Sequence, residues 1–304
     1  MCMDNQLITE IQRLKKEKNA IILAHYYVND ELQALADYVG DSFYLAKVAK
    51  GTNADVVVFC GVSFMGESAK LLNPEKTVLM PDITADCPMA HMAQVGKIKE
   101  LREKYEDLAV VCYINSTAEL KSHSDVCVTS SNAVNIVRKL PNQNIFFIPD
   151  VNLGRFVAEQ VPEKNVILND GYCPIHKNIN AEGVQKQKEK YPNALVMAHP
   201  ECEESVLKLA DYIGSTADMI TFAKNSPCQE FIVCTEEGVN YRLREDNPEK
   251  KFYFGGEYLC RDMKLNTLEK VLHVLKTGEN EMKLPEAVCD MAVKPLDRML
   301  ELAK

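Results

Sequence analysis

The stretch IILAHYY, residues 21–27, is an apolar run that leads directly into a histidine and two tyrosines. Two later stretches repeat this pattern, VVCYIN at residues 110–115 and LVMAHPE at residues 195–201. When the three are aligned, His25, Tyr113 and His199 correspond, and they lie 88 and 86 residues apart. Self-similarity at a nearly fixed spacing predicts an architecture built from repeated units.

Two further sets of residues share this spacing. Each copy has a hydroxyl residue after its next short apolar segment, and each copy closes with an apolar run that we expect to be a strand ending in a cysteine. The hydroxyl residues, 88 and 86 residues apart, are Ser42, Ser130 and Thr216. The cysteines, 86 and 87 residues apart, are Cys87, Cys173 and Cys260. Three sets with one period indicate three copies of a unit that is large enough to be a small domain.

Helical patterns separate the apolar runs, for example ELQALADYV at residues 31–39. Strands that alternate with helices predict βαβ units and parallel sheets. We therefore expect an α/β fold with three homologous, three-layer αβα domains, each doubly wound and all arranged around an approximate threefold axis. The expected domains are residues 1–87, 88–173 and 174–264, with the C-terminal segment 265–304 packed on the first.

The composition is typical of a globular protein, with 46% hydrophobic and 26% charged residues. A net charge of −9 and only short basic runs argue against a nucleic-acid partner. The longest apolar stretch, residues 108–114, is far shorter than the roughly 18 residues of a membrane span. Residues 1–18 also lack the apolar core of a secretory signal. We expect a cytoplasmic protein with no membrane partner.

The chain contains eleven cysteines, an odd number that argues against a disulfide framework, as does a compartment that keeps thiols reduced. Cysteines within apolar runs, such as Cys60, are best explained as small core residues. The three recurring cysteines differ, because strand ends around a threefold axis would bring them together. Soft thiolates bind zinc or iron–sulfur clusters. Three thiolates on a [4Fe–4S] cluster leave one iron open to act as a Lewis acid.

Polar residues follow the first apolar run of each copy: His25, Tyr27, Tyr113, Asn115, His199 and Glu201. Together they offer donors, phenols and a carboxylate for acid–base chemistry on a small polar substrate. Either histidine alone would more often be a buried residue bonded to the backbone. The three hydroxyl residues either cap helices or bind a carboxylate or phosphate group. His176, three residues after Cys173, either orients the cysteine loop or lies at the surface.

Ten motifs follow one another along essentially the whole chain: AHYY, GDS, FCGVSFMGES, ADCPMA, YINSTAE, TSSNA, PDVNLG, GYCPIH, HPEC and GSTADM. In this order they resemble the quinolinate synthase (NadA) family. The resemblance implies three homologous domains around a central [4Fe–4S] cluster. It also implies an enzyme of de novo NAD biosynthesis that condenses iminoaspartate with dihydroxyacetone phosphate to quinolinate, releasing phosphate and two waters.

Carried over by motif, the resemblance implies that Cys87, Cys173 and Cys260 hold the cluster. It implies acid–base roles for Tyr27, His199 and Glu201. The implied substrate contacts are His25, Ser42, Tyr113, Ile114, Asn115, Ser130, His199, Pro200, Glu201 and Thr216. After Cys260 this chain lacks the CxxCxxC stretch of some members, so it resembles the shorter type. An enzyme that oxidises aspartate to iminoaspartate is a candidate functional partner.

Two other functions share part of this pattern. Another [4Fe–4S] hydro-lyase, acting on a polycarboxylate, would have the same repeats and cysteines and would differ only in the motif series. A non-catalytic iron–sulfur or zinc protein that senses redox state would not need the polar residues at the strand ends. Iron and sulfide analysis separates zinc from a cluster, and an assay for quinolinate separates the two enzymes.

Overall fold

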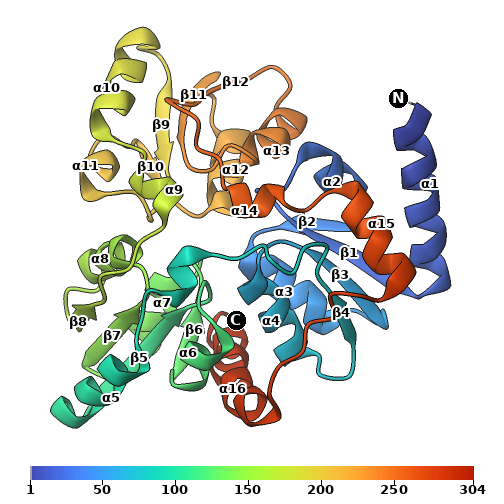
Figure 1. Ribbon diagram of the computed structural model, residues 1–304. Helices are drawn as coiled ribbons and strands as arrows, with labels where there is room; N and C mark the ends of the chain where they lie inside the picture. The colour runs from blue at the N-terminus through green and yellow to red at the C-terminus, as the bar shows by residue number, and fades with distance from the viewer. Residues whose placement is uncertain (1) are drawn as a thin grey trace.

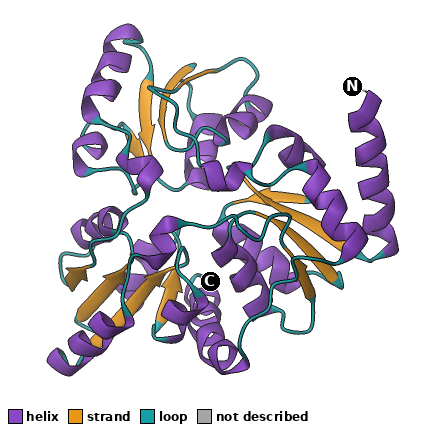
Figure 2. Ribbon diagram, in the orientation of Figure 1, coloured by secondary structure: helices purple, strands orange, loops and turns teal. Residues whose placement is uncertain are grey.

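Each unit of the repeat forms one four-stranded parallel sheet. The computed structural model describes residues 2–304, and the side chains of residues 5–304. The strand orders are β2-β1-β3-β4, β6-β5-β7-β8 and β10-β9-β11-β12, so the three sheets have the same topology. We call the parts of the chain that contain β1–β4, β5–β8 and β9–β12 the first, second and third unit. Helices cover both faces of the sheets, which confirms the α/β class and the three αβα units (Figure 2).

The three units form three lobes around a common centre, toward which α9 and α14 point (Figure 1). The first unit comprises α1 (Cys2–Glu17), β1 (Ala20–His25), α2 (Asp30–Leu35), β2 (Tyr38–Gly40), α3 (Ser42–Gly51), β3 (Val56–Cys60), α4 (Ser63–Leu72), β4 (Thr77–Leu79) and the 3₁₀ helix η1 (Pro88–His91). The second comprises α5 (Val95–Lys104), β5 (Leu108–Tyr113), α6 (Ala118–Ser122), β6 (Val126–Val128), α7 (Ala133–Lys139), β7 (Asn144–Ile148), α8 (Val151–Gln160) and β8 (Asn165–Leu168).

The third unit completes the arrangement and leads into the C-terminal helices. It comprises α9 (Pro174–Lys177), α10 (Ala181–Lys190), β9 (Leu195–Ala198), α11 (Glu204–Leu207), β10 (Tyr212–Ile213), α12 (Thr216–Asn225), β11 (Glu230–Cys234), α13 (Val239–Asp246) and β12 (Lys251–Tyr253). After it come α14 (Arg261–Lys264), α15 (Leu268–Thr277) and α16 (Glu286–Leu302). In the part of the chain that is described, no helix combines the length and apolar character needed to cross a membrane.

The repeat extends to single hydrogen bonds. In each unit an aspartate just before the second strand accepts a hydrogen bond from a backbone N–H of the first strand. The three pairs are Asp37 Oδ2 with Ile22 N at 2.8 Å, Asp125 Oδ2 with Val110 N at 2.7 Å, and Asp211 Oδ2 with Val196 N at 2.8 Å. The aspartates thus fix the pairing of the first two strands in the same way three times. The short strands β2, β6 and β10 that they precede were not predicted, since runs of two or three residues carry no clear periodicity.

The prediction that a strand of each unit ends in the recurring cysteine is wrong. Strands β4, β8 and β12 end at Leu79, Leu168 and Tyr253, and a loop follows each of them. Each recurring cysteine is instead the N-cap residue of a short helix, η1, α9 or α14. In the first unit Pro81 stands directly after Met80, and a proline has no N–H to continue the strand pairing.

The C-terminal segment touches two units. Helix α15 packs on α1 and β3 of the first unit. Helix α16 packs on α4 of the first unit and on α6 and β6 of the second. The domain boundaries at residues 87, 173 and 264 stay a prediction.

Buried side-chain amides join the first unit to the third unit and to the segment that follows α14. Gln33 Nε2 lies 2.9 Å from Tyr26 O and 3.1 Å from Val28 O within the first unit, and 3.0 Å from Gly238 O in the third. Asn266 Nδ2 donates to Gly61 O at 3.0 Å. Because Gln33 holds the carbonyl groups on both sides of Tyr27, this junction also fixes the loop that carries the tyrosine.

We expect Gln33→Met to lower the free energy of unfolding by about 1–3 kcal/mol, because the new side chain keeps the volume but leaves buried carbonyl groups without their donor. Urea unfolding under anaerobic conditions measures this loss. Gln185→Met, on an exposed face of α10, is the matched control and should have no comparable effect. Equal stability of the two variants would show that Gln33 does not support the junction.

Candidate active site

A cavity of about 420 Å³ lies where the carboxyl ends of the three sheets meet. The first strand of each unit delivers its polar residue there: His25 ends β1, Tyr113 ends β5 and His199 follows β9. The other predicted site residues that line the cavity are Tyr27, Ser42, Cys87, Asn115, Ser130, Cys173, Glu201, Thr216 and Cys260. Ile114 and Pro200 are not among the lining residues. The structure therefore brings twelve of the fourteen different predicted residues to one place.

The three recurring cysteines line this cavity together, one from each of η1, α9 and α14. Burial raises the pKa of all three thiols, that of Cys260 to about 11. The neighbouring Cys260 raises the pKa of Cys87 further, and the carboxylate of Glu201 does the same for Cys173. A bound metal would replace these thiol protons and offset the cost of three buried thiolates.

Two histidines present the same tautomer to the cavity. The backbone N–H of Tyr27 donates to His25 Nδ1 at 3.2 Å, and that of Glu201 donates to His199 Nδ1 at 3.3 Å. Burial lowers the pKa of both histidines to about 3, so both are neutral at ordinary pH. Since Nδ1 accepts, each ring carries its proton on Nε2 and is a hydrogen-bond donor there. His199 Nε2 lies 3.2 Å from Ser130 Oγ.

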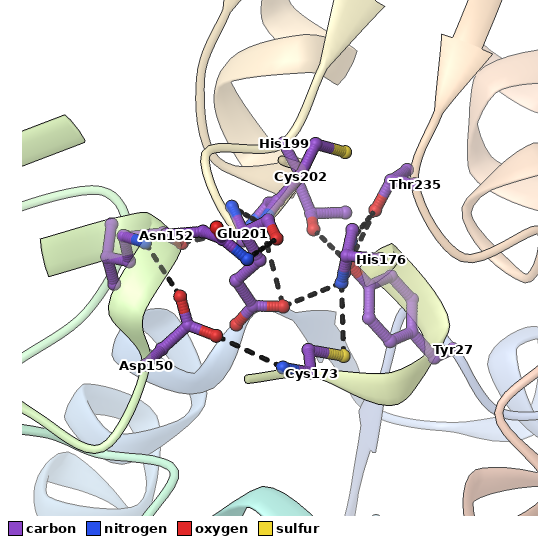
Figure 3. Close-up of polar contacts among 12 residues, drawn as sticks. Tyr27, Asp150, Asn152, Cys173, His176, His199, Glu201, Cys202 and Thr235 are labelled. Atoms are coloured by element: carbon purple, nitrogen blue, oxygen red, sulfur yellow. Dashed lines mark hydrogen bonds and ion pairs between the residues drawn. The ribbon is translucent and has the colours of Figure 1, made fainter. Parts of the chain in front are cut away.

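A chain of hydrogen bonds runs from Glu201 to Tyr27 (Figure 3). Glu201 Oε2 lies 2.7 Å from His176 Nδ1, and His176 Nε2 lies 2.9 Å from Thr235 Oγ1. Thr235 Oγ1 lies 2.9 Å from the Tyr27 hydroxyl, which also contacts Thr216 Oγ1 at 2.8 Å. No sequence pattern predicted that Thr235 belongs to the site. The alternative that His176 lies at the surface is wrong, because its side chain is buried.

Glu201 is the charged group of this arrangement. Burial alone would raise its pKa, but His176, His199 and the Tyr113 hydroxyl outweigh that effect and lower the pKa to about 2. Its Oε1 is buried and has no protein partner among the described residues. Burial, reinforced by Glu201, raises the pKa of Tyr27 and Tyr113 well above 10, so both remain phenols. The cavity thus places the carboxylate of Glu201 beside two neutral phenols.

The hydroxyl residues do not cap their helices. Asp41 caps α3 by accepting from Tyr44 N at 2.8 Å, and Ser215 caps α12 by accepting from Asp218 N at 3.2 Å. Ser42 and Thr216 are therefore the first residues of these helices. Ser130 precedes α7, and all three hydroxyl residues line the cavity. The capping explanation is wrong for these residues, and anion binding stays a prediction.

Two groups of residues could hold a metal, and both include Cys173. One is the set of three recurring cysteines. The other consists of Cys173, His176 and Glu201, whose ligand atoms lie within 4.8 Å of one another. An all-thiolate set favours an iron–sulfur cluster, whereas a mixed sulfur, nitrogen and oxygen set is also typical of zinc.

The other seven cysteines whose side chains are described lie outside the cavity. Cys202 is fully buried, with its Sγ 3.4 Å from Cys234 O. Cys228 Sγ contacts Glu230 O at 3.2 Å near the start of β11. The ten cysteines whose side chains are described form no disulfide bond with one another.

The fold and the cavity define an α/β enzyme that assembles one site from three repeated units. A family model described as NadA, quinolinate synthetase A protein, matches residues 9–301, and the chain belongs to this family. The quinolinate synthase of Fusobacterium nucleatum is 55% identical, over 96% of this chain and 98% of its own length. That of Clostridioides difficile is 51% identical over 99% and 100%, and that of Aquifex aeolicus 47% over 98% and 94%. The predicted family is thereby confirmed.

We expect His25→Asn to protect the protein at acidic pH. The folded protein holds the pKa of His25 at about 3, while the unfolded chain has the ordinary value of about 6.5. The stability from neutral His25 is therefore complete above pH 6.5 and is lost as the pH falls toward 3. At pH 5 the wild type should have lost about 2 kcal/mol relative to the variant.

Urea unfolding of the metal-free chain at pH 8, 6.5 and 5 measures this difference. The exposed His273 provides the control, because His273→Asn should not change the pH dependence in this way. A constant difference between His25→Asn and the wild type at all three pH values would contradict a buried neutral imidazole.

Proposed function

We propose that this chain is a quinolinate synthase that condenses iminoaspartate with dihydroxyacetone phosphate to quinolinate, releasing phosphate and two waters. The observation that carries the proposal is the cavity itself. It combines one cysteine from each unit with buried acid–base groups, in a chain of the quinolinate synthetase A family. The relatives that share about half of its sequence over nearly their full length are named for this activity.

We propose further that Cys87, Cys173 and Cys260 hold a [4Fe–4S] cluster. Support comes from the donor set, since three partly buried cysteines of one repeat phase line one cavity and no fourth described cysteine does. When bound, a cluster with three protein ligands supplies an open iron that acts as a Lewis acid toward a substrate oxygen or nitrogen. Buried thiols of this kind persist in the reducing cytoplasm, which is the location we propose.

The proposed proton relay ends at Tyr27. When the Tyr27 hydroxyl takes a proton from the substrate, it passes its own proton to Thr235 Oγ1, and Thr235 passes its proton to His176 Nε2. The carboxylate of Glu201 then stabilises the resulting imidazolium, as the carboxylate does in a Ser–His–Asp triad. The reverse sequence returns the proton. Each of the two transfers within the protein moves one proton along a hydrogen bond of 2.9 Å.

Neutral donors dominate the proposed substrate contacts. The Nε2–H groups of His25 and His199 offer hydrogen bonds to substrate oxygens, as do the hydroxyl groups of Ser42, Ser130 and Thr216. Backbone N–H groups in the first turns of α3 and α12 favour carboxylate and phosphate groups. Tyr113 and Asn115 complete the wall, and Asn115 Oδ1 is buried without a described partner. Ile114 and Pro200 do not line the cavity, and we propose no direct contact for them.

Because iminoaspartate hydrolyses readily, we also propose a functional link to an enzyme that oxidises aspartate. The alternative is a mononuclear metal bound by Cys173, His176 and Glu201. The observation that supports it is that their ligand atoms lie within 4.8 Å of one another. It predicts zinc or a single iron rather than equal amounts of iron and sulfide. It also predicts that His176→Ala removes the metal and that Cys87→Ala does not.

The cluster assignment predicts a specific pattern among cysteine variants. Anaerobically purified and reconstituted protein should contain about four iron and four sulfide per chain, the stoichiometry of the cluster. Cys87→Ala, Cys173→Ala and Cys260→Ala should each abolish it. Cys202→Ala and Cys228→Ala should keep it, because these side chains lie away from the cavity. Loss of the cluster in either control, with retention in Cys260→Ala, would refute the assignment.

The relay predicts that Thr235→Val lowers kcat for quinolinate formation by about a hundredfold, because valine keeps the shape but breaks the link between Tyr27 and His176. Iron content should not change. The assay uses iminoaspartate and dihydroxyacetone phosphate as substrates and detects quinolinate. Thr221→Val, on an exposed face of α12, is the control. If both variants have the wild-type kcat, no proton passes through Thr235.

A further inference from the structure

Two of the recurring cysteines are held by buried carboxylates. The backbone N–H of Cys173 donates to Asp150 Oδ2 at 3.1 Å, and that of Cys260 donates to Glu236 Oε1 at 3.0 Å. Both carboxylate side chains belong to fully buried residues. Figure 3 shows Asp150 directed toward the backbone of Cys173. Each carboxylate therefore fixes the residue from which a thiol projects into the cavity.

The two carboxylates occupy equivalent places in their units. Asp150 stands two residues beyond the end of β7, and Glu236 stands two residues beyond the end of β11. The second oxygen of each is bound to its own turn, Asp150 Oδ1 to Leu153 N at 2.6 Å and Glu236 Oε2 to Gly238 N at 2.7 Å. With both oxygens engaged, neither carboxylate can rotate without releasing the cysteine.

The first unit has no carboxylate at this position. Val62 stands at the equivalent place beyond β3 and has no polar atom in its side chain. Burial alone would raise the pKa of Asp86, the residue before Cys87, but Ser63, the backbone N–H of Cys87 and His91 lower it. The hydroxyl of Ser63 donates to Asp86, and His91 Nε2 lies 2.7 Å from it. A carboxylate group thus lies close to each recurring cysteine, although in the first unit it belongs to the neighbouring residue Asp86.

We infer that Asp150 and Glu236 are positioning residues for the metal centre, which hold Cys173 and Cys260 in the orientation that ligates it. This inference rests on the proposed cluster. The N–H of an N-cap residue has no partner within its helix, so without the carboxylate the loop that carries the cysteine would be free to turn. The geometry of the ligating sulfur depends on that backbone. Loss of either carboxylate should therefore weaken the bond of one cysteine to the metal centre and leave the bonds of the other two cysteines unchanged.

The test compares Asp150→Asn and Glu236→Gln with the wild type after anaerobic reconstitution. Each amide keeps one oxygen acceptor but places an NH₂ group against the cysteine N–H or its own turn. Iron release to EDTA should be about tenfold to a hundredfold faster, the factor expected for the loss of one hydrogen bond to a carboxylate. The terminal Fe–S stretching bands in resonance Raman spectra should shift, because the orientation of one ligand changes.

Matched controls come from the same units. Asp125→Asn and Asp211→Asn remove carboxylates that also accept a backbone N–H, at 2.7 Å and 2.8 Å, but at the start of the first strand and not at a cysteine. These variants should lose stability while keeping the wild-type iron-release rate and Raman bands. If Asp150→Asn and Glu236→Gln behave like these controls, the carboxylates are structural and the inference is wrong.

Two further outcomes remain distinguishable. Wild-type protein that contains no iron and sulfide after reconstitution would overturn the proposed cluster, whereas a wild-type cluster with unaffected variants would overturn only the positioning role. If the buried variants do not fold, Asp86→Asn tests the same principle at the Cys87 corner, because Asp86 is partly exposed. Wild-type release and Raman bands in Asp86→Asn would then contradict the inference.

Discussion

At the centre of this molecule, backbone N–H and C=O groups need hydrogen-bond partners that strand pairing does not supply. Three parallel sheets present their carboxyl ends to one cavity, and three short helices begin there. Neither the last residues of a strand nor the first N–H groups of a helix are paired within their own element. Side chains satisfy them, such as Gln33 at the Tyr27 loop and Asp150 at Cys173. The same contacts that satisfy the backbone fix the site.

Burial then determines the chemistry that the site offers. Far from water, histidine and tyrosine stay neutral, so His25, His199 and Tyr27 are hydrogen-bond donors rather than ions. One carboxylate, Glu201, stays charged because His176 donates to it. Arg261 is the single lysine or arginine side chain among the described lining residues. Anionic substrates would thus be held mainly by oriented dipoles.

The sequence predicted the features that repeat along the chain. The strand patterns and the repeated spacing of His25, Tyr113 and His199 can be read directly from the sequence. They were sufficient to predict the fold and twelve of the residues that line the cavity. The burial of His176 and its hydrogen bond to Thr235 depend on contact between α9 and the residue that follows β11, which no local pattern connects. The sequence does contain a signal for Asp150 and Glu236. They occupy the same position of the repeat as Val62, just as the three cysteines occupy one position of the repeat.

The three units keep the same fold but differ in what they place at equivalent positions. Cysteine recurs in all three. The aligned residue at or just after the end of the first strand is His25, Tyr113 or His199, and the residue two places on is Tyr27, Asn115 or Glu201. A ligand on the threefold axis would contact each unit in the same way, so each unit can bind it with the same residue type. Two different substrates beside that axis would contact the three units differently, so the residues that bind them can differ. Under the proposed function, the identical residues at one phase would hold a shared central ligand, and the divergent residues at the other phase would bind two different substrates.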